Sequence, residues 1–67
     1  MRLRELREDH DLTQRELAEM LHVSQNTYSQ YETGKRQFPI ELLIKVSEYY
    51  NVSTDYVLEL TNVPERK

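Results

Sequence analysis

The chain has 67 residues with no cysteine, one glycine and two prolines, and nine Lys and Arg against twelve Asp and Glu give a formal net charge of -3. A chain of this length forms one small domain without the deep pocket of most enzymes, and its two histidines cannot by themselves complete a structural zinc site. We therefore expect no enzyme activity, no metal and no cofactor. The stability of the domain is expected to come from helix packing or from oligomerisation. The net charge alone does not favour a nucleic-acid partner.

The N-terminal residues do not have the pattern of a targeting segment. Met1, Arg2 and Leu3 are followed by further charges rather than by a long apolar run, so they do not resemble a secretory signal. No stretch of the sequence is apolar for long enough to span a bilayer. We expect a cytoplasmic protein that makes no contact with a membrane.

Hydrophobic spacing predicts a first helix over residues 2–9. Leu3, Leu6 and His10 follow one another at intervals of three and four residues, which places them on one face of a helix. The other positions of this stretch are rich in Glu and Arg and are expected to face the solvent. Leu12 then follows the helix into the core.

A second helix is predicted to begin at Gln14. Thr13 and Glu16 have the T-x-x-E spacing of a capping box, in which the hydroxyl accepts from a first-turn amide and the carboxylate reaches back to the cap. The apolar stripe of this helix comprises Leu17, Ala18 and Leu21. Ser24 is a further N-cap candidate, and it leaves a connection of about three residues to the next helix.

The third helix is predicted over residues 25–33. It ends at Gly34, the only glycine in the chain, which suits the left-handed C-cap position. Pro39 excludes helix at Phe38 and allows a fourth helix to start after it. The apolar side of the fourth helix comprises Leu42, Leu43, Val46 and Tyr50. We expect this helix to end near Asn51, which tolerates the left-handed conformation.

Ser53 is the expected N-cap of a fifth helix, with Asp55 in its first turn. The apolar side of this helix comprises Tyr56, Val57 and Leu60. No alternating strand pattern remains, so the predicted fold class is all-α, a compact five-helix bundle over residues 1–60. Residues 61–67 contain Pro64 and little that is apolar, and we expect them to form a flexible C-terminal tail.

The second and third helices, joined by a short turn, form a predicted helix-turn-helix. At about 100° per residue, Tyr28 and Tyr31 fall on one side of the third helix and uncharged polar residues fall on the other. These polar residues are Gln25, Asn26, Ser29, Gln30 and Thr33. Amides and hydroxyls are poorer helix formers than Lys and Glu, so this face needs another reason to exist. Base recognition supplies one, because such side chains pair with the edges of bases.

Basic and polar groups flank this face. Lys35 and Arg36 follow the C-cap glycine, where a helix in a groove would bring them toward phosphates. Gln14, with its free first-turn amide, would meet the DNA backbone on the other side. Ser24 and Thr33 lie at the two ends of the third helix, and we assign them to the DNA backbone as well. The expected partner is double-stranded DNA.

Four separated segments resemble the Cro/repressor-type (XRE, lambda-repressor-like) helix-turn-helix family. They read LTQRELAE at 12–19, VSQ at 23–25, YETGKR at 31–36 and VSTDY at 52–56. The resemblance implies a DNA-binding domain of five helices that binds palindromic operators as a dimer, with its second and third helices as the reading unit. It also implies that Gln14 contacts phosphate and that the base-facing residues are Gln25, Asn26 and Gln30, with Ser29 between them.

The same resemblance implies an ion pair between Arg7 and Glu32, which would tie the first helix to the third. The family commonly has glycine where this chain has Asp11, His22 and Asn51. These residue types tolerate positive φ better than most others do. We therefore expect the fold to be kept at some cost in stability.

We expect a sequence-specific transcriptional regulator, a repressor that binds as a homodimer with its third helix in the major groove. Two alternatives stay open. One is a protein-interaction module that keeps the fold, such as the antitoxin partner of a toxin, and the other is the N-terminal DNA-binding domain of a longer regulator. The acidic balance and Tyr49, which we expect to be exposed, favour a protein contact. Glu16 and Glu19 lie on an exposed helix face and are not expected to be catalytic.

Overall fold

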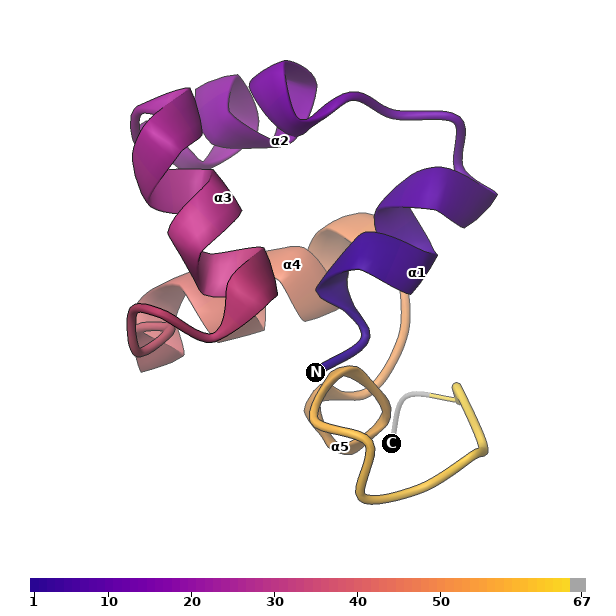
Figure 1. The fold of residues 1–67 in the computed structure, drawn as a ribbon. Coiled ribbons are helices and arrows are strands. Elements are labelled where there is room, and N and C mark those ends of the chain that lie inside the picture. Colours follow the sequence, from indigo (N-terminus) through magenta and orange to yellow (C-terminus); the bar gives the residue numbers. More distant parts are fainter. Residues whose placement is uncertain (66–67) are drawn as a thin grey trace.

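Five helices and no strand make up residues 1–65, the part of the chain that the computed structural model describes (Figure 1). The helices are α1 (Leu3–Asp9), α2 (Gln14–Leu21), α3 (Gln25–Thr33), α4 (Ile40–Tyr50) and α5 (Thr54–Val57). In Figure 1, α2 and α3 lie together on one side, and α5 lies next to the N-terminus. The prediction of an all-α five-helix bundle is confirmed. No helix within residues 1–65 is long and apolar enough to cross a bilayer.

The three helices preceded by a hydroxyl residue begin where expected. Thr13 Oγ1 accepts from the Glu16 N–H at 3.1 Å, and the Glu16 carboxylate accepts from the Thr13 N–H at 2.9 Å, which completes the capping box of α2. Ser24 Oγ accepts from the Thr27 N–H at 3.1 Å at the start of α3. Ser53 caps α5 in the same way. Each cap satisfies an amide that the first turn leaves unpaired, and the three predicted starts are confirmed.

One residue in the left-handed conformation follows each of the first four helices. His22, Gly34 and Asn51 are the C-caps of α2, α3 and α4, with φ of 58°, 79° and 57°. Asp11 has a φ of 55° in the turn after α1. The expectation that Asp11, His22 and Asn51 adopt this conformation is confirmed. A left-handed residue other than glycine costs roughly 1–2 kcal/mol, and Asp and Asn cost less because their side chains bond locally.

The predicted extent of the fifth helix was wrong at its C-terminal end. α5 ends at Val57, and Leu60, expected on its apolar side, is 73% exposed. Glu59 turns into the left-handed region with a φ of 64°. The Leu60 N–H then donates to the Asp55 carbonyl at 2.8 Å, a bond that closes the helix and turns Leu60 outward.

Arg2 donates to two carbonyls at the C-terminal end of α5. The Arg2 Nε donates to the Tyr56 carbonyl at 2.9 Å, and the Arg2 backbone N–H donates to the Val57 carbonyl at 2.8 Å. The guanidinium also lies 4.4 Å from the centroid of the Tyr56 ring. The N-terminus therefore satisfies carbonyls at the end of α5.

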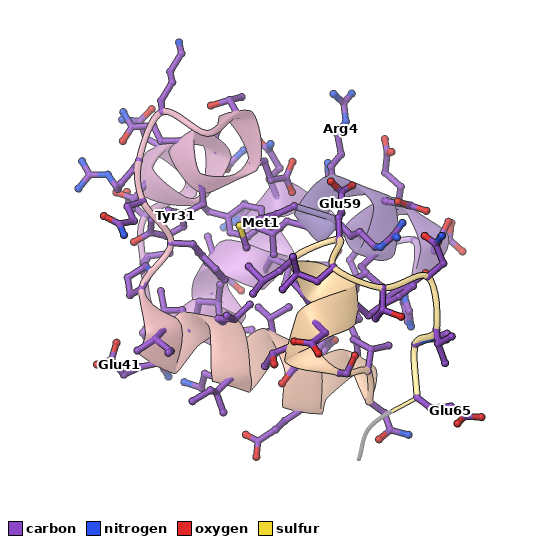
Figure 2. The ribbon with its side chains drawn as sticks, turned by 90° about the horizontal axis from the view of Figure 1, so that it is seen from below. Met1, Arg4, Tyr31, Glu41, Glu59 and Glu65 are labelled. Atoms are coloured by element: carbon purple, nitrogen blue, oxygen red, sulfur yellow. The ribbon has the colours of Figure 1, made fainter. Side chains whose placement is uncertain are left out.

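The buried apolar side chains form one core to which every helix contributes. They are Leu3, Leu6, Leu17, Ala18, Leu21, Tyr28, Tyr31, Leu43, Val46, Tyr50, Val52 and Val57. Tyr28 and Tyr31 are 0% and 7% exposed, so the aromatic side of α3 faces inward as predicted. Arg4, Glu41 and Glu65 point away from this core in Figure 2.

The described part of the expected C-terminal tail, residues 61–65, is hydrogen-bonded to the domain at three places, one of which is the Asn62 Oδ1, which accepts from the Arg2 Nη2 at 2.7 Å. The Arg2 Nη2 donates to the Thr61 carbonyl at 3.2 Å, and the Ser53 N–H donates to the Pro64 carbonyl at 3.0 Å. The last two residues of the tail lie outside the described residues. The domain boundary expected after residue 60 stays a prediction.

Candidate nucleic-acid interface

α2, three connecting residues and α3 form the expected helix-turn-helix. The turn is compact because the Val23 N–H donates to the Ala18 carbonyl at 3.0 Å and His22 takes the left-handed conformation. Tyr28 and Tyr31 bury one side of α3. The opposite side of the helix is therefore presented to the solvent.

The exposed side of α3 carries only uncharged polar side chains. Gln25, Asn26 and Thr33 are exposed, while Ser29 and Gln30 are half-exposed. Within residues 1–65, the side chains of Gln25, Asn26 and Ser29 form no hydrogen bond. The side chains of Gln30 and Thr33 do form hydrogen bonds. These three side chains can donate and accept at a base edge without first breaking a bond inside the protein.

Gln30 is already paired with Arg36, because the Arg36 Nε donates to the Gln30 Oε1 at 2.9 Å. Arg36 was expected at the DNA backbone and Gln30 at a base edge. Their mutual contact was not predicted, because no sequence pattern signals a side-chain bond across the turn after a helix. Lys35 is exposed, and it forms no ion pair in the part of the chain that the structure describes.

The hydroxyls expected at the DNA backbone are engaged within α3. Ser24 Oγ donates to Thr27 Oγ1 at 2.9 Å and accepts from the Thr27 amide. Thr33 Oγ1 donates to the carbonyls of Ser29 and Gln30, at 3.2 and 3.3 Å. A phosphate oxygen only accepts hydrogen bonds, so either hydroxyl would have to give up its present acceptor to bind one.

Glu32, in the last turn of α3, is held by side chains from α1 and α2. Arg7 donates through Nε to Glu32 Oε2 at 2.8 Å and through Nη2 to Oε1 at 3.3 Å, and the two side chains are 13% and 3% exposed. Gln14 Nε2 donates to Glu32 Oε1 at 3.1 Å. Gln14 therefore keeps one Nε2 hydrogen and its backbone amide for the phosphate contact assigned to it.

Burial and hydrogen bonding act on Glu32 in opposite directions. Burial raises the pKa of this carboxyl, whereas the interactions with Arg7, Tyr28 and Gln14 lower it, and the net pKa lies below the ordinary value of 4.5. The hydrogen bond to Glu32 in turn raises the pKa of Arg7. Both groups therefore keep their charges in the folded domain.

Because the pKa of Glu32 is lowered in the folded domain, we expect the free energy of unfolding to depend on pH. A carboxyl with a lower pKa in the folded state than in the unfolded state stabilises the fold above pH 4.5, and this contribution is lost as the pH falls through the lowered pKa. The difference in free energy of unfolding between the wild type and Glu32→Gln should be largest at neutral pH and shrink in acid. Urea unfolding between about pH 3 and 7 measures it. A difference that is constant over this range would contradict the prediction.

The exposed charge near α3 is positive although the whole chain is acidic. Between residues 21 and 38, Lys35 and Arg36 stand against a single acidic residue, Glu32. The Glu32 side chain is 3% exposed and is neutralised by Arg7, so it adds little negative potential at the surface. Lys35 and Arg36 are therefore the exposed charges within residues 21–38, and both are positive.

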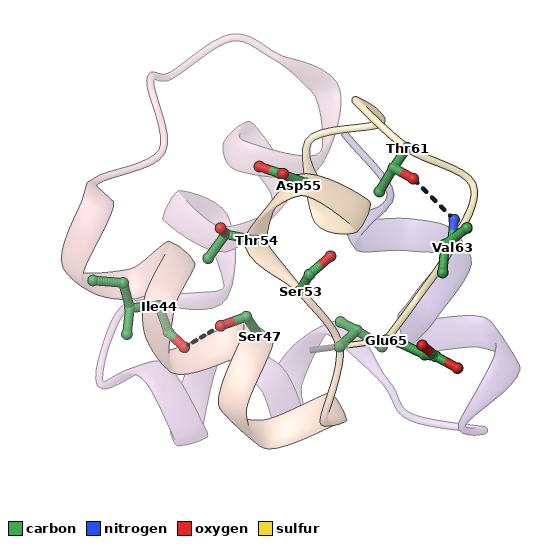
Figure 3. A pocket seen from close by; sticks show the side chains of 9 residues that line it. Ile44, Ser47, Ser53, Thr54, Asp55, Thr61, Val63 and Glu65 are labelled. Atoms are coloured by element: carbon green, nitrogen blue, oxygen red, sulfur yellow. Dashed lines mark hydrogen bonds between the residues drawn. The ribbon is translucent and has the colours of Figure 1, made fainter. Parts of the chain in front are cut away.

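A cavity of about 500 Å³ lies elsewhere, between α4, α5 and the segment that follows α5 (Figure 3). It is lined by Ile44, Ser47, Val52, Ser53, Thr54, Asp55, Thr61, Val63 and Glu65. None of these residues belongs to α2 or α3. Ser47, on its wall, donates its hydroxyl proton to the Ile44 carbonyl at 2.7 Å. The cavity is therefore separate from the candidate interface.

Comparisons with known proteins agree on one family. A family model described as helix-turn-helix matches residues 3–57. The chain is 39% identical over 66 residues to YobD of Bacillus subtilis, an uncharacterized HTH-type transcriptional regulator, over 98% of this chain and 59% of YobD. It is 42% identical over 65 residues to the HTH-type transcriptional regulator ImmR of the same organism, over 97% and 51% of the two chains. It is 39% identical over 51 residues to antitoxin PezA of Streptococcus pneumoniae, a match that covers 76% of this chain and 32% of PezA.

These similarities concern only part of each relative. The chain spans 59% of YobD and 51% of ImmR, so about half of the length of these curated relatives is matched. The names of these relatives describe transcriptional regulators and an antitoxin, not enzymes. No solved structure matches the chain.

Proposed function

The chain belongs to the XRE-type helix-turn-helix family and has its lambda-repressor-like fold, and from this premise we propose that it is a sequence-specific transcriptional regulator that binds DNA with α3 in the major groove. The single observation that carries the proposal is the exposed side of α3. It is free of charged residues, while the exposed Lys35 and Arg36 follow directly after the helix. An uncharged reading surface beside basic side chains suits base edges that lie between phosphates.

We assign the contacts as follows from the exposure and bonding of each side chain. Gln25, Asn26, Ser29 and Gln30 meet base edges. Gln14, Ser24, Thr33, Lys35 and Arg36 lie where the DNA backbone would pass, with Lys35 and Arg36 supplying the positive charge. The ion pair of Arg7 and Glu32 fixes α3 against α1 and contacts no DNA, because both side chains are buried.

The regulator is proposed to act as a homodimer on a palindromic operator. Large apolar side chains stay exposed outside α3, among them Ile44 and Tyr49 of α4 and Leu58 after α5. Their burial between two copies would favour association. Two α3 helices would then enter major grooves about one helical turn, roughly 34 Å, apart. We propose repression, since occupation of an operator is enough to block other proteins, and a cytoplasmic location, since the target is DNA.

The Gln25→Ala variant tests the assignment of the reading surface. The Gln25 carboxamide is exposed and has no hydrogen-bond partner within residues 1–65, so its loss should leave the fold unchanged. Binding to a site selected from random DNA should weaken by about 1–3 kcal/mol, with no change in binding to random DNA. Fluorescence anisotropy with both DNAs measures the two affinities.

Lys35→Ala provides the matched control, because Lys35 is equally exposed but is assigned to phosphate. This variant should weaken binding to selected and random DNA alike. The slope of log affinity against log salt concentration should fall in magnitude by about one, which corresponds to one phosphate contact. Equal losses on the two DNAs for Gln25→Ala would reject the base-reading role. The spacing of half-sites in the selected DNA tests the dimer.

A second function, that of an antitoxin-like interaction module, is favoured by one observation, the similarity to antitoxin PezA over 51 residues. The exposed Tyr49 would then be part of a protein contact. A partner that co-purifies in a fixed ratio, together with no shift of any DNA at low salt, would favour this function over the first. Selected DNA sites without a protein partner would reject it.

A further inference from the structure

The turn after α3 places Arg36 next to the C-terminal end of the exposed side of α3. Gly34 takes the left-handed conformation, and the Gln30 carbonyl then accepts from the Lys35 N–H at 2.9 Å and from the Arg36 N–H at 3.3 Å. Two backbone bonds to one carbonyl fix the position of Arg36 relative to Gln30 before any side-chain contact forms. The nearness of the two side chains is therefore a consequence of the helix cap.

The side-chain contact also determines which atom of the Gln30 carboxamide faces Arg36. A guanidinium has N–H donors and no acceptor, so only the carboxamide oxygen can lie against it. The distance of 2.9 Å between Arg36 Nε and Gln30 Oε1 shows this arrangement. The Nε2 group of Gln30, with its two hydrogens, is then left for a further partner.

We propose that Arg36 is a positioning residue that makes Gln30 a hydrogen-bond donor and so selects guanine at the base pair that Gln30 reads. The inference rests on the proposed function and names the base at one position of its site. Guanine presents two acceptors in the major groove, N7 and O6, whereas adenine presents the N7 acceptor beside the N6 donor. A carboxamide whose oxygen is turned toward Arg36, so that its Nε2 group faces away from the guanidinium, suits the edge with two acceptors.

Without Arg36, the Gln30 carboxamide can turn over and pair with adenine through its oxygen and its Nε2 together. Loss of Arg36 should therefore change which base is preferred. A side chain that only contacts phosphate contributes to affinity for any sequence and leaves base preference unchanged. Base preference at one position thus separates the positioning role from the phosphate role.

The experiment selects binding sites from random DNA with the wild type, Gln30→Ala, Arg36→Ala and, as a control on the same exposed turn, Lys35→Ala. The position at which Gln30→Ala loses its preference identifies the base pair that Gln30 reads. The wild type should prefer guanine there. Arg36→Ala should shift the ratio of guanine to adenine toward adenine by at least about fivefold at this position alone. Lys35→Ala should lower affinity and keep the ratio.

A second measurement needs no DNA. The side-chain amide resonances of Gln30 in the free protein should move in Arg36→Ala and stay in place in Lys35→Ala, because only Arg36 is bonded to this carboxamide. Equal spectra would overturn the inference, and so would an unchanged base ratio in Arg36→Ala or a wild-type preference for adenine. If the wild type selects no site at all, the proposed function fails and the inference fails with it.

Discussion

Replacing Arg7 by alanine is expected to lower the free energy of unfolding by about 3–5 kcal/mol, because the Glu32 carboxylate would stay buried without a counter-ion. Glu32 is 3% exposed and receives two hydrogen bonds from Arg7, at 2.8 and 3.3 Å. Gln14 Nε2 would still donate to the carboxylate. Small domains are stable by only about 5–15 kcal/mol, so this loss should bring the variant close to unfolding. Urea unfolding followed by circular dichroism at neutral pH measures it.

Arg15→Ala is the matched control for this prediction. Arg15 and Glu19 also form an Arg–Glu pair, at 3.4 Å, but their side chains are 78% and 70% exposed. Solvent-exposed pairs contribute about 0–1 kcal/mol, so this variant should unfold almost like the wild type. Similar losses for Arg7→Ala and Arg15→Ala would show that the burial of Glu32 does not matter.

A double variant distinguishes the cost of leaving the Glu32 charge buried without a partner from the cost of lost packing. In Arg7→Met with Glu32→Leu, no charge is buried and both sites keep side chains of comparable volume. This protein should be more stable than Arg7→Ala. If it is equally destabilised, the loss in Arg7→Ala comes from packing and from the bond between Arg7 Nη1 and the Leu12 carbonyl, at 2.9 Å, rather than from the stranded carboxylate.

Local signals predicted most of the fold. Thr13, Ser24 and Ser53 mark helix starts because a hydroxyl cap acts within the same turn, so the nearby sequence contains all the partners. Gly34 and Asn51 mark helix ends for the same reason. The buried side of α3 could also be predicted, because it follows from periodicity along one helix.

The interactions that the sequence did not reveal join residues from different elements. Arg2 bonds the Tyr56 carbonyl at the end of α5 across 54 positions, a contact that no signal near residue 58 indicates. Gln14 turns toward Glu32, a choice between partners that depends on how α2 packs against α3. Patterns of spacing identify which face of a helix is exposed, but the pairing of side chains on that face depends on three-dimensional distances.

Tyr28→Ala is expected to cost about 3–5 kcal/mol, through the loss of a fully buried aromatic side chain and the cavity left behind. Tyr28 is 0% exposed and is the largest of the fully buried side chains, on the inner side of α3 opposite the reading surface. Because its loss weakens the packing that holds α3 on the core, we expect the variant to lose DNA binding together with its helical circular dichroism signal. Thermal and urea unfolding measure the effect.

Tyr28→Phe distinguishes the ring from the hydroxyl. The Tyr28 hydroxyl is buried and has no hydrogen-bond partner within residues 1–65, and burial next to Glu32 raises the pKa of the phenol, so the group stays neutral. Removing it loses the interaction of the phenol with Glu32 but no longer requires a polar group without a well-formed hydrogen bond to be buried, so the change in stability should lie within about 1 kcal/mol. A loss in Tyr28→Phe as large as in Tyr28→Ala would mean that the hydroxyl, through Glu32, holds α3 in place.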